Sequence, residues 1–152
     1  MKKVDTFEYV SVLKELVEEG REVSMTISGS SMSPFLCHER DQVFFKAPDR
    51  PLRVGDMVFF RRRSGRYVLH RICRIKDGGY YIVGDAQTEI EGPVAREQIF
   101  ALVTKVRRKG RILAPGDFWW EFFARVWVRL IPFRPALTRI YGLIHKIGLH
   151  NI

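Results

Sequence analysis

The feature that most constrains the fold is a series of short apolar runs separated by tight-turn signals. Residues 22–27 alternate, with Val23, Met25 and Ile27 on one side and polar residues on the other, as in a half-buried β-strand. Further strand-like runs lie at 41–46, 57–61, 67–75, 80–83 and 99–106. Turn signals rich in Pro, Gly, Asp or Ser separate the runs, at 48–49, 54–56, 64–65, 77–79 and 91–93. The pattern predicts a small, mainly β fold with antiparallel strands.

Helical patterns flank the strand-rich region, so three segments are expected: an N-terminal helix at 1–21, a β domain at 22–113 and a C-terminal helical appendage at 114–152. Asp5 and Glu8 form a capping pair for the first helix, and Gly20 can end it. After Gly116, helical spacing recurs in two stretches that Pro132 and Pro135 separate. We therefore expect a β-rich α+β fold that ends in an aromatic and basic helical hairpin.

Composition and charge narrow the class of protein. The 152 residues are 46% hydrophobic, which suits one packed domain with an appendage, and 26 basic against 17 acidic residues leave a net charge of +9. Such a charge favours an acidic partner. Cys37 and Cys73 are too few for a disulfide framework. Because Asp5 and Glu8 interrupt any apolar leader and no run of about 18 apolar residues occurs, we expect neither a signal peptide nor a transmembrane helix, and either a cytoplasmic or a peripheral membrane location.

A hydroxyl-rich turn after the first strand contains the candidate nucleophile. Among its serines we favour Ser31, because Gly29 permits an unusual backbone before it and Pro34 fixes the exit of the chain. A serine hydroxyl needs a base and oxyanion donors to act as a nucleophile. The candidate oxyanion and substrate-binding residues are Ser28, Gly29, Ser30 and Met32. The alternative is a serine-rich surface loop.

A histidine and an aspartate complete the candidate site. His70 lies in a strand-like run, on the same side as Val68 and Ile72, and imidazole is suited to the role of general base. Asp85, in a Gly-Asp turn after a strand, is expected to orient it, with Glu91 and Asp56 as alternatives. A structural histidine and a solvated turn aspartate are the competing interpretations.

Four motifs in order resemble those of type I signal peptidases and the related self-cleaving repressors. Residues 28–34 (SGSSMSP) resemble the serine box, in which the nucleophile directly precedes methionine. Residues 54–60 resemble the glycine-aspartate strand motif, residues 67–72 (YVLHRI) the base-containing box, and residues 82–87 (IVGDAQ) the final glycine-aspartate box. At the position of His70, most bacterial signal peptidases have lysine. The histidine in this sequence resembles the endoplasmic-reticulum type instead. The resemblance covers roughly residues 22–106.

The resemblance implies a signal-peptidase-like β fold, with Ser31 as nucleophile, His70 as general base and no metal or organic cofactor. It also implies that a substrate peptide adds as an extended strand beside residues 22–27, and that small residues precede the cleaved bond. Three departures stand out. Gly29 replaces an oxyanion-stabilising serine, Ala86-Gln87 replaces the usual residues after Asp85, and a soluble-looking helix replaces the N-terminal membrane anchor.

Basic and aromatic residues suggest a surface for a partner. Two basic clusters, at 61–76 and 105–111, and the tryptophans and phenylalanines of 118–133 are typical of contact with anionic phospholipid. Alternatively, they are solvated hairpin tips and rings packed on the β core.

Two other functions compete with a peptidase. One is a nucleic-acid-binding regulator, which is disfavoured because too few residues precede the serine strand for a helix-turn-helix. The other is a non-catalytic peptide-binding module. A zinc site from Cys37, His38, His70 and Cys73 is disfavoured because His70 and Cys73 alternate across their strand.

Overall fold

A computed structural model describes residues 6–146 and confirms the mainly β, α+β prediction. Eight strands form one sheet in the order β1-β2-β7-β3-β4-β5-β6, with β8 paired to β7, and every pairing is antiparallel. The strands are β1 Val23–Thr26, β2 Gln42–Lys46, β3 Met57–Arg61, β4 Tyr67–Lys76, β5 Gly79–Val83, β6 Glu91–Val94, β7 Ile99–Arg108 and β8 Arg111–Leu113.

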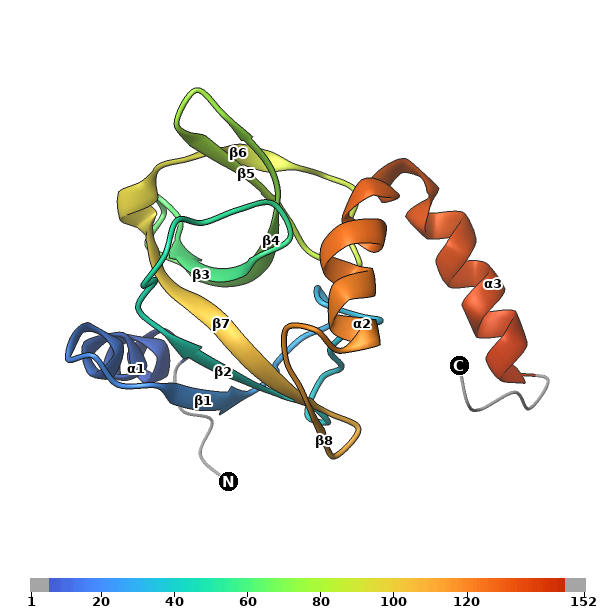
Figure 1. The fold of residues 1–152 in the computed structure, drawn as a ribbon, viewed down its shortest axis with the longest axis horizontal. Coiled ribbons are helices and arrows are strands. Elements are labelled where there is room, and N and C mark those ends of the chain that lie inside the picture. Colours follow the sequence, from blue (N-terminus) through green and yellow to red (C-terminus); the bar gives the residue numbers. More distant parts are fainter. Residues whose placement is uncertain (1–5, 147–152) are drawn as a thin grey trace.

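The N-terminal helix lies at one end of the strongly curved sheet and the C-terminal helices lie at the other (Figure 1). They are α1 Thr6–Glu18, η1 Arg96–Gln98, α2 Phe118–Glu121, η2 Phe122–Val126, η3 Trp127–Arg129, η4 Ile131–Phe133 and α3 Arg134–Lys146. Helix α1 ends as predicted at Gly20, which has a φ of 87° and donates its N–H to the carbonyl of Val17. The proposed capping residue Asp5 lies outside the described residues.

The segment 118–133 differs from the regular helix that its spacing predicts. One α-helical turn is followed by a π-helical turn and two 3₁₀ turns. Phe123, Trp127 and Val128 are buried, and Phe123 and Trp127 pack in the larger core cluster. Within this segment Arg125 Nε lies 2.7 Å from Glu121 Oε2, which is an i, i+4 ion pair.

Two apolar clusters form the core. The larger one joins α1, the serine turn, one face of the sheet and the C-terminal helices, with Phe35, Phe59 and Trp127 among its members. The smaller one contains Val58 and Phe60 from the other face of β3. Strand β3 is therefore buried on both faces, which explains its continuous apolar run.

Irregular pairing bends the sheet, and register shifts occur within β2–β7, β3–β7, β4–β5 and β5–β6. Strand β6 was not predicted, because Gly92-Pro93 reads as a turn. It pairs only with β5 among the described residues, and an edge strand tolerates proline. Strand β8 was also missed. No helix within residues 6–146 is long and apolar enough to cross a bilayer.

Candidate active site

A cleft of about 1170 Å³ lies between the serine turn and the β3–β4 hairpin. Ser31 and His70 both line it, so the structure brings the predicted nucleophile and base, 39 positions apart in the sequence, to one cavity. Their side chains make no hydrogen bond to each other in the described part of the chain. Catalytic hydrogen bonds are often long before substrate binds. The remaining walls include Met25, Ile27, Leu69 and Gln87.

Buried apolar residues hold the serine turn from behind. Met32, Phe35 and Leu36 are all buried in the larger core cluster. The turn itself needs glycine at position 29, where φ is 88°. The Gly29 N–H donates to Nδ1 of His38 at 2.8 Å. The turn is thus anchored at both ends while Ser31 stays half-buried at the cleft.

Two backbone amides at the candidate nucleophile have no acceptor in the described part of the chain. The N–H groups of Ser31 and Met32 donate no hydrogen bond within residues 6–146. Of the other predicted residues, Ser28 and Ser30 are exposed and line the cleft, so their hydroxyls remain available. Gly29 differs, because its N–H already binds His38. Met32 contributes its backbone only, since its side chain is 2% exposed.

The loop at 84–87 holds the serine turn in place through its backbone. The Ala86 N–H donates to the Ser31 carbonyl at 2.9 Å. A Cβ atom on Gly84 would lie 2.6 Å from the same carbonyl oxygen, which is closer than such atoms approach. Glycine at this position therefore lets the two loops meet.

His70 is almost completely buried, with 3% of its surface exposed. Burial lowers its pKa from 6.5 to about 4; the charge of Glu91 opposes this shift and that of Arg62 adds to it. The imidazole is therefore neutral at pH 7, as a general base must be. Its Nδ1 atom is buried and has no hydrogen-bond partner among residues 6–146, and the centre of its ring lies 6.3 Å from that of Phe60.

Glu91 is the carboxylate that lies beside His70. Its Oε1 atom is 3.8 Å from His70 Nδ1. The same carboxylate accepts hydrogen bonds from Arg62 at 2.7 and 3.1 Å, which weakens its pull on the imidazole. Glu91 was an alternative for the third member of the site. It comes from β6, the strand that the sequence analysis missed.

Asp85 occupies a different position from the one expected. Both of its carboxylate oxygens accept hydrogen bonds at 2.8 Å from Arg71, and neither residue exposes more than 1% of its surface. The pair is a buried structural ion pair behind the cleft, so the prediction that Asp85 binds the His70 imidazole is not met. Arg71 was also assigned to the basic surface, which is wrong. Asp56, the other alternative, pairs with Arg50 in a separate cavity.

Arg134 reinforces the loop behind the cleft from the start of α3. Although 1% exposed, its guanidinium donates to the carbonyls of Gly84, Gln87 and Trp127 at 2.9 to 3.0 Å. Trp127 in turn donates its indole N–H to the Asp85 carbonyl. The C-terminal appendage is thereby joined to the site. No local pattern marks Arg134 as buried, so sequence reasoning missed it.

Comparison of the chain with protein-family models, curated proteins and solved structures found no match. Within residues 6–146, no three His, Cys, Asp or Glu side chains are grouped so that they could hold a metal ion. Cys37 and Cys73 are both half-buried free thiols.

The burial of His70 predicts a pH-dependent loss of stability. Because its pKa is about 4 in the folded chain and 6.5 in its ordinary state, the unfolded chain binds more protons between these values. The contribution of His70 is therefore complete above pH 6.5 and is lost as the pH falls through about 4. Urea unfolding at pH 7 and pH 4 should show that wild type loses about 3 kcal/mol more than His70→Gln. Equal losses would contradict a buried neutral imidazole.

Proposed function

We propose that the protein is a serine endopeptidase of signal-peptidase type that cleaves a leader or precursor peptide. The observation that carries this proposal is the shared cleft. It contains a serine on a rigid turn, free backbone amides beside it and a neutral, buried histidine. These are the parts of an acyl-transfer site.

In this mechanism Ser31 attacks the peptide carbonyl while His70 accepts the hydroxyl proton and later returns it to the leaving amine. The free N–H groups of Ser31 and Met32 stabilise the oxyanion. Glu91 orients the imidazole by accepting a hydrogen bond from Nδ1. Its Oε1 atom now lies 3.8 Å from Nδ1, so the two atoms must approach by about 1 Å to form this bond. Arg71 and Asp85 support the site from behind without contacting the substrate.

The sheet edge at β1 supports recognition of an extended peptide. Strand β1 pairs only with β2 among the described residues, so its other edge has unpaired backbone groups that a substrate strand can bind. Met25 and Ile27 from the β1 side and Leu69 from β4 line the same cleft. Short apolar side chains suit these walls.

Exposed apolar residues on the C-terminal helices support a location of the peptidase at an anionic membrane surface. Phe133, Ile140 and Leu143 expose 61%, 52% and 57% of their surfaces, and the chain has a net charge of +9. Apolar side chains beside basic ones favour the headgroup region of a bilayer. Such contact would hold the peptidase near membrane-bound precursors.

A mixture of diverse peptides, analysed by mass spectrometry, tests the proposal. We expect cleavage at internal bonds after small residues, and loss of cleavage by at least about 100-fold in His70→Gln, because general-base catalysis contributes about 10²–10⁴-fold. Arg63→Gln, an exposed change on the neighbouring hairpin, is the control.

The missing hydrogen bond between Ser31 and His70 favours one competing function. If the folded chain binds extended peptides but releases them uncut, it is a non-catalytic peptide-binding module. Salt-sensitive, sequence-selective binding of DNA without peptide cleavage would instead indicate a nucleic-acid-binding regulator.

A further inference from the structure

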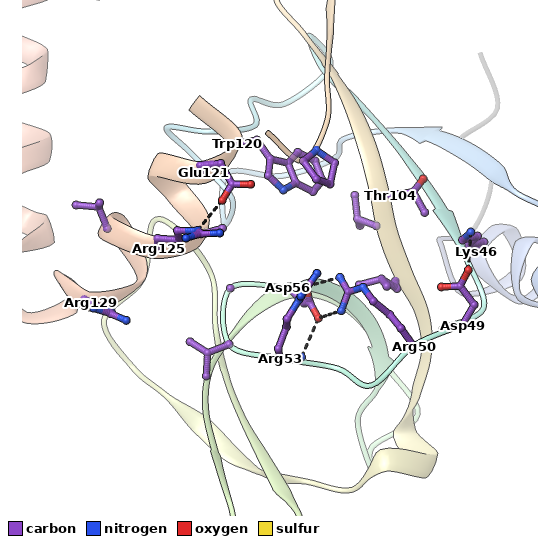
Figure 2. Close-up of a pocket in the computed structure, with 17 residues that line it drawn as sticks. Lys46, Asp49, Arg50, Arg53, Asp56, Thr104, Trp120, Glu121, Arg125 and Arg129 are labelled. Carbon is purple, nitrogen blue, oxygen red and sulfur yellow. Dashed lines mark hydrogen bonds and ion pairs between the residues drawn. The ribbon is translucent and has the colours of Figure 1, made fainter. Parts of the chain in front are cut away.

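A second cavity, of about 710 Å³, lies away from the candidate active site and is rich in basic side chains. It opens between the β2–β3 loop, strand β7 and the C-terminal helices (Figure 2). Its five basic residues are Lys46, Arg50, Arg53, Arg125 and Arg129. Trp120 forms part of the wall, and its indole N–H donates to no acceptor in the described part of the chain.

Every carboxylate in this cavity already has a basic partner. Asp49 lies 2.8 Å from Lys46, and Asp56 accepts two hydrogen bonds from Arg50, at 2.9 and 3.0 Å, and one from the Arg53 backbone. Glu121 accepts from Arg125 and from the N–H of Gly116. The dashed lines in Figure 2 show that these pairs stand around the cavity.

Two guanidinium groups remain without a partner. The side chains of Arg53 and Arg129 make no hydrogen bond or ion pair within residues 6–146, and they come from separate elements, the β2–β3 loop and η3. The pKa of Glu121 is lowered first by the hydrogen bond from the Gly116 N–H, then by Arg125 and also by the charge of Arg53. The charge of Arg53 therefore acts on a group of this cavity. The cavity therefore has an uncompensated charge of about +2.

We propose that this cavity binds a phosphate group, with Arg53 and Arg129 as its main ligands. A guanidinium presents paired donors that match the geometry of phosphate oxygens. Two of them, from different elements, line one cavity, and Trp120 with its unused indole N–H lines it as well. The inference does not depend on the proposed peptidase activity.

The phosphate group has two sources that fit the cavity. A free anion such as pyrophosphate needs only the basic groups. A phospholipid headgroup also needs apolar surface at the rim, which Val54 and Val126 provide, each with 45% of its surface exposed. Both sources use the same chemistry, so separate arms of one experiment must distinguish them.

The test compares the full chain with Arg53→Gln/Arg129→Gln. Pyrophosphate is titrated calorimetrically at low ionic strength, and vesicles of phosphatidylglycerol in phosphatidylcholine are used for co-sedimentation. We expect the double variant to bind at least about tenfold more weakly, because charge-assisted hydrogen bonds are lost. It should fold normally, since both arginines are exposed and their side chains make no hydrogen bond or ion pair within residues 6–146.

The matched control is Arg63→Gln/Arg111→Gln, which lowers the net charge equally at exposed positions outside the cavity. Pyrophosphate binding that is weakened only in the cavity variant supports a free phosphate ligand. Sedimentation with phosphatidylglycerol but not with phosphatidylcholine alone, lost only in that variant, supports a headgroup. Equal weakening in both variants, or no binding of either probe by wild type, would overturn the proposal.

Discussion

Replacing Ser31 with alanine is expected to abolish peptide cleavage while leaving the fold intact. The substitution removes the proposed nucleophile, and loss of a serine nucleophile typically lowers kcat by about 10³-fold or more. The Ser31 hydroxyl makes no hydrogen bond within residues 6–146, so the free energy of unfolding should change by less than about 0.5 kcal/mol. Initial rates on a peptide that wild type cleaves, together with urea unfolding curves, provide both measurements.

Ser33→Ala is the matched control for this experiment, because it changes another hydroxyl in the same turn. Within the described part of the chain, the Ser33 hydroxyl makes one weak hydrogen bond, 3.9 Å from Cys37 Sγ. We expect Ser33→Ala to retain activity within a few-fold of wild type. Undiminished cleavage by Ser31→Ala would rule out the proposed mechanism, whatever the behaviour of the control.

The largest expected effect on stability comes from Asp85→Asn. This change leaves the Arg71 guanidinium, 1% exposed, without its ion-pair partner and with only the Gly55 carbonyl as an unaltered acceptor. Removing one partner of a buried ion pair typically costs about 3–5 kcal/mol. Chemical denaturation at pH 7 should therefore show a much lower midpoint with an unchanged slope.

Two further variants test whether the loss comes from the unpaired charge. Glu18→Gln breaks the exposed pair with Lys14 and should cost less than about 1 kcal/mol. Replacing both buried partners, as Arg71→Met with Asp85→Leu, should recover part of the stability, because neither charge is then left unpaired. A loss of less than about 1 kcal/mol in Asp85→Asn would contradict a structural role for the pair.

Alternating strands and the serine turn were predictable from local pattern. The alternating run at 22–27 corresponds to β1, because alternation reports which side of a strand is buried. The apolar runs at 57–61 and 67–75, bounded by turn signals, correspond to β3 and β4. Gly20 and Gly29 were predictable for a similar reason, since left-handed backbone at a helix end or a turn favours glycine. Strand β6 was not predictable in this way, because its Gly-Pro pair has the local pattern of a turn.

The partners of the polar residues were less predictable, because they depend on residues far apart in the sequence. Asp85 and Glu91 both follow β5, and nothing local distinguishes them. The register of β4 against β5 pairs Arg71 with Val83, which brings Arg71 next to Asp85. The edge strand β6 delivers Glu91 to His70 instead.

The amino-acid sequence alone predicted the β-rich class and the positions of most strands, and it allowed Ser31 and His70 to be proposed, because each depends on residue types and spacing within short segments. Only the tertiary structure decided which acidic group faces the imidazole, that Arg71 and Arg134 are buried, and that a second basic cavity exists. Those outcomes follow from how a bent sheet brings distant loops together, and from the rule that a buried charge must find a partner wherever the fold offers one.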